Sequence, residues 1–302
     1  MLKKKVLFSV RMHHDVIADI VDLLRKEDRI NFVFHDPLRE FFDLAELEQR
    51  FGDVDFFIVK IGNDSSIDLL HWVKLNNKPA LHDYETVLMC KNKVALDQSL
   101  RKMFQDHPHL SEHFALPQSW NNNLREVEKF KKWASDKLPI VVKSHNQHDK
   151  YRRFNFLVRD LNEDIDQFCE RYSEFLFYDV YIQKFVECDG FDRKIYVMGD
   201  QIFGLKRENP IYIFMRDKPD DIDVTKIERE DFEVSEEIKE LASIISSDLK
   251  LRIYGLDLVK SLDDGRYYLI DINDFPSFRG IENIDEILST YLVEYSKSQL
   301  NK

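Results

Sequence analysis

The sequence predicts a mixed α/β protein, and three patterns lead to this prediction. Strand-like apolar runs alternate with apolar residues at helical spacing over the N-terminal quarter. A compact buried-strand pattern follows at 139–143. Two strand–turn–strand patterns lie in the C-terminal half, with turn residues at 199–200 and 263–265. This mixture indicates several sheets with helices packed on them.

The N-terminal quarter is predicted to form a small alternating layer. The continuous apolar run 6–10 is typical of a buried strand, and from Val16 to Leu24 apolar residues recur at the spacing of one helix face. The other elements expected before residue 105 are strands at 30–34, 55–61 and 80–82, a short helical stretch at 44–47, and helices at 66–75 and 91–103.

The rest of the chain is predicted to be richer in strands. Pro108 and Pro117 interrupt helix formation. The acidic stretch 217–231 is expected to be a mobile connection. We expect helices at 124–134, 163–175 and 235–249, and strands at 139–143, 156–158, 178–186, 194–198, 201–207, 254–260 and 267–272.

The composition narrows the classes of partner and compartment. The 302 residues carry 56 acidic and 44 basic side chains, a formal net charge of -12, which argues against unaided nucleic-acid binding. The apolar run that precedes Arg11 is too short for a signal peptide or a membrane span. The three cysteines are widely spaced and form no metal-binding or disulfide pattern. We expect a cytoplasmic protein with no membrane segment, and a monomer.

Three oxygen-bearing side chains are predicted to converge on the last hairpin. Alternate residues of a strand share a face, so Asp271 and Asn273 lie together, and the turn at 263–265 brings Asp257 alongside them. A solvated acidic sheet face is the simple alternative. Carboxylates brought together beside a buried face are costly without a cation, and such a face is indicated by Leu256, Leu258, Ile270 and Ile272. Hard oxygen ligands of this kind suit Mg²⁺ shared with substrate phosphates.

A C-terminal motif links the sequence to a known family. It reads Asp271-Ile272-Asn273-Asp274-Phe275-Pro276-Ser277-Phe278-Arg279-Gly280 and resembles a motif of the ATP-grasp enzymes, in particular the inositol tris/tetrakisphosphate kinases. The resemblance runs in order over most of the chain. It implies an ATP-grasp fold with an N-terminal α/β domain at 1–88, a central subdomain at 89–189 and a C-terminal subdomain at 190–302. It also implies ATP and Mg²⁺ as cofactors, with the metal held by Asp257, Asp271 and Asn273.

The resemblance also assigns nucleotide-binding residues. Adenine is expected to bind against one strand and the hinge that follows it, an apolar slot with exposed backbone amides. By its pattern alone, this segment would be an ordinary core strand. Its residues are Gln183, Lys184, Phe185, Val186 and Glu187. Four cations are expected to hold the phosphates: Lys143 at the end of its strand, Lys93 with Lys91 as the alternative, and Lys194 and Arg207, which we expect to face each other across a hairpin. Taken singly, each would more often be a solvated surface charge.

A basic loop at 144–153 is expected to bind a polyanionic acceptor. The resemblance implies a histidine near the transferred phosphate, for which His148 fits better than His145, and Arg152 lies in the same loop. Other acceptor-binding residues are expected elsewhere in the chain, at Arg11, Lys60 and Ser277. The family usually has a glycine in this loop and at the position of Ser277, so we expect side chains to replace backbone contacts.

Together these features predict a kinase that uses ATP and Mg²⁺ and transfers the γ-phosphoryl group to a hydroxyl of a polyphosphorylated small molecule, an inositol phosphate. Lys143, His148, Lys194 and Arg207 are expected to act in catalysis. Two alternatives remain open: an ATP-grasp carboxylate–amine ligase that acts through an acyl phosphate, and a nucleotide-binding module without turnover. The sequence contains no dinucleotide, P-loop or nucleophile-elbow motif that would favour another class.

Overall fold

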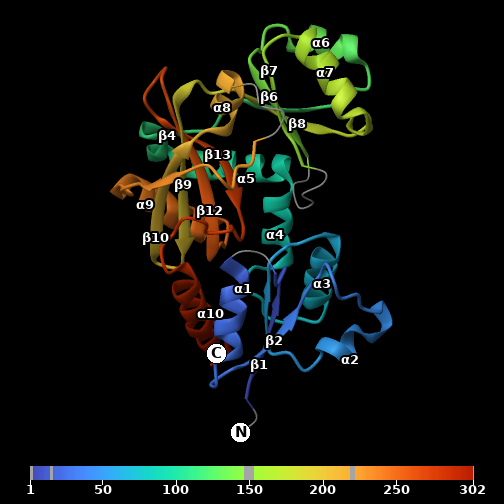
Figure 1. Ribbon diagram of the computed structural model, residues 1–302, viewed down its shortest axis with the longest axis vertical. Helices are drawn as coiled ribbons and strands as arrows, with labels where there is room; N and C mark the ends of the chain where they lie inside the picture. Colours follow the sequence, from blue (N-terminus) through green and yellow to red (C-terminus); the bar gives the residue numbers. More distant parts are fainter. Residues whose placement is uncertain (1–2, 14–15, 146–152, 218–221, 302) are drawn as a thin grey trace.

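The computed structural model describes residues 3–13, 16–145, 153–217 and 222–301, and its strands form three sheets (Figure 1). We call them the N-terminal sheet (three strands), the central sheet (four strands) and the C-terminal sheet (six strands). The central sheet with its two helices stands at the top of Figure 1, and the N-terminal sheet lies at the bottom. The prediction of a mixed α/β fold is confirmed.

The N-terminal sheet is parallel, with β1 between β2 and β3. Its strands are apolar because helices cover both faces. Along β1, Val6 and Phe8 pack toward α1, whereas Leu7 packs toward α3. The elements are β1 (Lys5–Ser9), α1 (Val16–Arg25), β2 (Asn31–His35), a 3-10 helix (Leu44–Glu46), α2 (Leu47–Phe51), β3 (Phe56–Val59) and α3 (Asp64–Leu75).

The C-terminal sheet has the order β11-β10-β9-β12-β13-β4. Both predicted hairpins are confirmed: β9 pairs with β10 and β12 with β13, each antiparallel. Gly199 and Gly265 take the left-handed conformation that these turns need, with φ of 59° and 73°. The strands are β4 (Phe114–Ala115), β9 (Cys188–Met198), β10 (Gln201–Glu208), β11 (Arg229–Asp231), β12 (Ile253–Ser261) and β13 (Tyr267–Asn273); nearby helices are α5 (Lys93–Asp106), a 3-10 helix (Pro108–Glu112), α8 (Pro210–Asp217) and α9 (Glu236–Asp248).

The central sheet is antiparallel, with the order β5-β8-β6-β7. One face is covered by its own helices, so Ile140, Val142 and Ile182 are buried against Phe130 and Phe168. The alternate positions of β6 and β8 point to the other face. The elements are β5 (Ser119–Asn122), α6 (Val127–Ala134), β6 (Ile140–Ser144), β7 (Asn155–Val158), α7 (Glu163–Arg171), a 3-10 helix (Ser173–Phe175) and β8 (Val180–Lys184).

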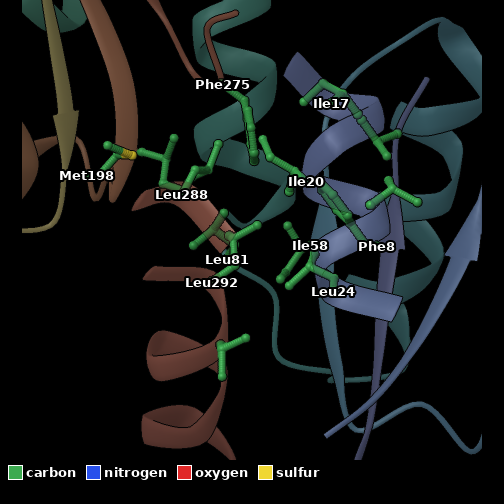
Figure 2. Close-up of a cluster of buried hydrophobic side chains, with 14 of the residues drawn as sticks. Phe8, Ile17, Ile20, Leu24, Ile58, Leu81, Met198, Phe275, Leu288 and Leu292 are labelled. Atoms are coloured by element: carbon green, nitrogen blue, oxygen red, sulfur yellow. The ribbon is translucent and has the colours of Figure 1, made fainter. Parts of the chain in front are cut away.

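Helix α10 (Ile284–Leu300) comes from the C-terminal end of the sequence and packs against elements from its N-terminal end. It lies against α1, as Figure 1 shows. Leu288 and Leu292 of α10 enter the same buried cluster as Phe8 and Ile20 (Figure 2). Met198 and Phe275 add the C-terminal sheet and the loop after β13 to this cluster, and Figure 2 shows Leu288 between Met198 and the N-terminal side chains. The N-terminal and C-terminal sheets therefore share one core.

The helix expected at 91–103 is α5, which begins at Lys93; Lys91 instead ends a separate helix that was not predicted, α4 (Tyr84–Lys91), and the two helices meet at Asn92. Asn92 has an extended backbone, and its side chain accepts hydrogen bonds from the N–H groups of Val94 and Ala95 at 3.1 and 3.0 Å. These bonds cap the N-terminus of α5, so a new helix begins directly after Asn92. The strand expected at 80–82 is only a single parallel bridge between Ala80 and Phe57.

Six helices and strands of the described structure were not predicted, namely β4, β5, β11, α4, α8 and α10, nor was the 3-10 helix Pro108–Glu112. Three of them are strands of two to four residues, too short to show an alternating pattern. None of the helices in the described part of the chain has the length and hydrophobicity that crossing a lipid bilayer requires.

Candidate active site

A row of charged side chains crosses the C-terminal sheet. Lys194 of β9 pairs with Asp257 of β12, and Asp257 pairs in turn with Asp271 of β13. Residues directly opposite on neighbouring strands point to the same face, so these three side chains share one face with Asn273, two residues beyond Asp271. The strand register thus confirms the prediction that Asp257, Asp271 and Asn273 lie on one face of the sheet.

A β-bulge makes this arrangement possible. Asp257 pairs with Asp271 but Leu258 pairs with Leu269, so β13 carries one extra residue, Ile270. In a regular strand, Leu269 and Asp271 would share a face. The bulge lets Leu269 enter the core, where it is 1 % exposed, while Asp271 turns to the charged face. Ile270, expected in the buried face, is only half-buried.

Two lysines neutralise the two carboxylates in this structure. The Lys194 ammonium lies 2.5 Å from Asp257 Oδ1, and Lys93, which is 6 % exposed, forms an ion pair with Asp271. Burial opposes the charge of Lys194 and Asp257, but their mutual attraction is stronger. The pKa of Lys194 is therefore raised and that of Asp257 lowered. The Asp257 carboxylate is thus held ionised, as a metal ligand must be.

The side chains of β6 and β8 place a further lysine over this row. Lys143 is 7 % exposed, and its Nζ donates a 2.6 Å hydrogen bond to Gln183 Oε1. Burial lowers the pKa of Lys143 from 10.5 to about 8, while the charges of Asp271 and Lys93 act on it in opposite directions. An ammonium held in a dry site by a neutral amide is well placed to receive an anion.

Arg207 occupies a different position from the one expected. It does not stand opposite Lys194, which pairs with Leu205; it stands opposite Asp192, two residues along the hairpin. Arg207 Nη2 lies 3.2 Å from Asp192 Oδ2 in an ion pair that is almost buried. Lys194 and Arg207 are therefore diagonal neighbours on one face, separated by a carboxylate.

Asp192 was missed in the sequence analysis, although its position two residues before Lys194 places it on the same strand face. It accepts hydrogen bonds from Arg207 and from Asn209 Nδ2, the latter at 2.7 Å. Burial raises its pKa above the ordinary aspartate value. The charged face therefore carries three carboxylates: Asp192, Asp257 and Asp271.

The structure separates the roles of Lys91 and Lys93. Lys93 starts α5 and faces the charged row through Asp271, whereas Lys91 ends α4 and forms an ion pair with the buried Asp274. The intervening cap residue, Asn92, turns the two lysines in different directions. The geometry therefore favours Lys93 over Lys91 as the phosphate-facing residue.

The expected adenine segment connects β8 to β9. Lys184 donates its ammonium to the carbonyls of Lys137 and Leu138 at 3.0 and 2.6 Å, and the Phe185 N–H donates to the Pro139 carbonyl at 3.0 Å. The Phe185 ring lies 6.0 Å from that of Tyr212. Val186 is half-buried and Glu187 is exposed. This segment is an aromatic-lined edge between the central and C-terminal sheets, which suits a flat heterocycle.

The expected acceptor-binding cations point inward. Lys60 donates to the carbonyls of Phe275 and Pro276, the latter at 3.2 Å, and its ammonium lies 4.7 Å from the Phe275 ring centroid. Arg11 donates to the Gly62 carbonyl. Ser277 is half-buried in the loop that Lys60 contacts. Both cations are therefore engaged by protein groups. His148 and Arg152 lie outside the described residues.

Replacing Lys60 with methionine is expected to remove part of the pH dependence of stability. Burial, with repulsion from Lys91, lowers the pKa of Lys60 from 10.5 to about 7. Between pH 7 and 10.5 the folded state then binds fewer protons than the unfolded state, so wild-type stability rises with pH, by at most about 1.4 kcal/mol per pH unit. Urea unfolding at pH 7, 8, 9 and 10 should show wild-type gaining stability relative to Lys60→Met.

The matched control for that experiment is Lys78→Met. The Lys78 ammonium also donates to two backbone carbonyls of the N-terminal layer, those of Gly52 and Val54. It therefore reports what loss of a comparable contact costs. If the stability of wild-type and Lys60→Met followed parallel curves across this pH range, the assignment of a neutral, buried Lys60 would be wrong.

The donor set on β12 and β13 fits a magnesium ion. Its members are two aspartate side chains on adjacent strands and one amide, all hard oxygen ligands. Among the described residues, no group of three or more histidine, cysteine or carboxylate side chains is placed to hold a metal, so the remaining ligands would come from substrate phosphates and water. The Pro276 ring packs closely against Gly255, which stands opposite Asn273. A Cβ at this position would lie 3.2 Å from that ring, so a larger residue would crowd the loop after β13.

Comparisons with known proteins agree with this geometry. Residues 171–294 match the family model of the inositol 1,3,4-trisphosphate 5/6-kinase ATP-grasp domain. A RimK domain ATP-grasp protein from Sphaerobacter thermophilus superposes with a TM-score of 0.68 at 14 % identity, over 96 % of this chain and 98 % of that chain. The chain has the ATP-grasp fold.

Two further ATP-grasp structures cover almost the whole chain. D-alanyl-alanine synthetase A from Vibrio cholerae has a TM-score of 0.68 at 15 % identity, over 100 % of both chains. A RiPP-associated ATP-grasp ligase from Chryseobacterium gregarium, solved with ADP and a leader and core peptide, has a TM-score of 0.65 at 14 % identity, over 97 % of this chain and 96 % of that chain. No curated protein sequence matches the chain.

The kinase-domain match covers only part of the ATP-grasp chain described above. It includes Lys194, Arg207 and the three oxygen-bearing side chains Asp257, Asp271 and Asn273 of β12 and β13. It does not include the N-terminal sheet or the two lysines at 93 and 143. The similarity to a kinase is thus concentrated in the C-terminal sheet.

Proposed function

We propose that this protein is an enzyme that uses ATP and Mg²⁺ to transfer the γ-phosphoryl group to an acceptor oxygen, and that the acceptor is a hydroxyl of a polyphosphorylated small molecule such as an inositol phosphate. The observation that carries the proposal is the row Lys194–Asp257–Asp271 with Asn273, facing Lys143 from the central sheet. The similarity of residues 171–294 to the inositol phosphate kinase domain supports the choice of acceptor.

Charge neutralisation and positioning are the main work in such a reaction. Asp257, Asp271 and Asn273 would hold Mg²⁺, and the ion would supply positive charge that offsets the charge of the triphosphate. Lys93 and Lys194 sit where they can exchange a carboxylate partner for a phosphate oxygen. Lys143 approaches from the opposite sheet. The site thus encloses a triphosphate between two rigid strand faces, and no covalent intermediate on the protein is needed.

A second candidate function is a carboxylate–amine ligase that forms an acyl phosphate. One observation favours it: Lys60 and Arg11 donate to backbone carbonyls rather than standing ready for substrate phosphates. Two of the three structures described above are a ligase and a synthetase that align with nearly the whole chain. Both functions share the same nucleotide and metal residues, so only the acceptor distinguishes them.

The product distinguishes these candidates. Purified protein is incubated with ATP and Mg²⁺ and either a panel of inositol phosphates or mixtures of carboxylic acids and amines, and phosphorus NMR follows the products. A kinase gives ADP and a new phosphomonoester without inorganic phosphate. A ligase gives ADP and inorganic phosphate, and only when both substrates are present. ATP binding without ADP formation in every mixture would contradict an enzymatic role and favour a nucleotide-binding module.

A further inference from the structure

Two arginines stand directly opposite each other at the edge of the C-terminal sheet. Arg207 of β10 pairs with Arg229 of β11. Like charges in this arrangement repel and require a compensating charge. Arg207 has Asp192, at 3.2 Å, but within the described part of the chain no carboxylate lies within ion-pair distance of Arg229. The sheet edge therefore holds one guanidinium without a counter-charge.

Backbone carbonyls occupy the space between the two guanidinium groups. Arg229 Nη2 donates to the Val224 carbonyl at 3.0 Å, and Arg207 Nη1 points to the same oxygen at 3.4 Å. Arg229 Nη1 donates to the Ile227 carbonyl at 2.7 Å. The neutral Val224 carbonyl thus lies where the charges of the two guanidinium groups converge. Among the described residues, the buried Arg229 Nε–H has no acceptor.

This arginine pair belongs to the charged face. Arg207 stands opposite both Asp192 and Arg229, and Asp192 is two residues from Lys194, so all four side chains point to the same side of the sheet. The loop after the metal ligands packs against Arg229: a Cβ added to Gly280 would lie 2.7 Å from Arg229 Cδ. Arg229 is therefore next to the loop that carries Ser277.

The charges on this face do not balance. The cations are Lys93, Lys143, Lys194, Arg207 and Arg229, and the carboxylates are Asp192, Asp257 and Asp271, with the exposed Asp231 at the edge strand, which forms no ion pair with Arg229 among the described residues. Three ion pairs leave Lys143 and Arg229 without an acidic partner among the described residues. Lys143 comes from the central sheet, on the nucleotide side, whereas Arg229 is at the edge strand. The two unpaired cations therefore serve different parts of the substrate complex.

We propose that Arg207 and Arg229 form a paired-guanidinium site for an anionic group, phosphate or carboxylate, carried by the acceptor, and that this group displaces the Val224 and Ile227 carbonyls. The inference rests on the proposed phosphoryl transfer. Lys194 on β9 and Arg229 on β11 are two strand spacings apart, about 10 Å, and are offset by two residues along the strands, about 7 Å, so their backbone positions are about 12 Å apart. The acceptor therefore carries its anionic group about this far from the oxygen that is phosphorylated, and a guanidinium fork suits either oxyanion.

The test uses two probes on protein saturated with ADP and Mg²⁺. Inositol hexakisphosphate supplies phosphate and a tri-glutamate peptide supplies carboxylate, and calorimetry gives the dissociation constant of each. We expect Arg229→Gln to weaken the binding of at least one probe tenfold or more and to leave ADP binding within twofold of wild-type. The probe that is affected identifies the oxyanion. Arg266→Gln, at an exposed arginine on the hairpin turn, is the control and should change neither constant.

Arg229→Lys guards against misfolding, because it keeps an alkyl stem beside Gly280 but lacks the fork and the buried Nε donor. It should fold and still weaken the same probe several-fold. Equal probe affinity in wild-type and both variants, or no probe binding by wild-type protein that binds ADP, would overturn the arginine site. Failure of wild-type protein to bind ADP would instead overturn the proposed function itself.

Discussion

Asp271→Asn is expected to reduce the rate of ADP formation at least about a thousand-fold, because it removes one of the two carboxylates that we propose as metal ligands. Asp271 lies opposite Asp257 and is turned to the charged face by the bulge at Ile270. Asparagine keeps the size of the side chain but not its charge. The measurement is ADP release under saturating ATP and Mg²⁺, with the best acceptor from the product screen.

The same substitution should leave the fold intact at a moderate cost in stability. Lys93 stays buried but loses its carboxylate partner, which is expected to lower the free energy of unfolding by about 1–3 kcal/mol. Circular dichroism and thermal unfolding separate this loss from the loss of activity. Asp263→Asn, in the exposed turn of the same hairpin, is the control. A turnover close to wild-type in Asp271→Asn would refute the metal assignment.

Lys143→Met is expected to have the second-largest effect, and to move activity and stability in opposite directions. A charge-assisted hydrogen bond to phosphate contributes about 1.5–3 kcal/mol, so its loss should lower kcat/KM for ATP about 10- to 100-fold. Without nucleotide, Lys143 is a buried ammonium whose only protein partner in the described residues is the neutral Gln183 amide. Methionine removes that desolvated charge, so unfolding should require more denaturant.

Proton uptake gives an independent check on Lys143. Its pKa of about 8 in the unliganded protein should rise when a triphosphate binds, because an anion stabilises the charged form. Between pH 8 and 10.5, nucleotide binding should therefore take up protons, which calorimetry in buffers of different ionisation enthalpy detects. Lys143→Met should lose this uptake, and Lys132→Met, at an exposed position of α6, should keep it. Equal uptake in Lys143→Met and wild-type would contradict the role given to Lys143.

The sequence contained enough information to predict the two hairpins and the metal register. Gly199 and Gly265 mark turns that only a positive φ permits, and once the turns are placed, strand periodicity brings Asp257 beside Asp271. The bulge at Ile270 was not predictable, because Leu269 and Asp271 have the spacing of one face. The bulge can be recognised only from the pairing of β13 with β12, in which Asp257 pairs with Asp271 but Leu258 pairs with Leu269.

Other differences arise from contacts between distant segments. Lys60 ends a strand and resembles a solvent-facing cation, but its partners, the carbonyls of Phe275 and Pro276, lie more than 200 residues away. The choice between Lys91 and Lys93 depended on the cap at Asn92 and on which carboxylate each helix end approaches. Local patterns carry no information on either point.

Two features left a signal that was not used. Asp192 precedes Lys194 by two residues, the spacing that defines a strand face. Ile284, Leu288 and Leu292 recur every four residues, the mark of a buried helix face, and they form the contact face of α10. A search for periodicity over the C-terminal 20 residues would have found this helix.

Because α10 completes the core around β1 and α1, these two elements cannot finish packing until the much later α10 has been synthesised. Phe8 and Ile20 gain Leu288 and Leu292 as neighbours only after residue 292 has been synthesised. During translation the early strands therefore expose an apolar surface for most of the elongation time, and chaperones that hold nascent chains would have their natural target there.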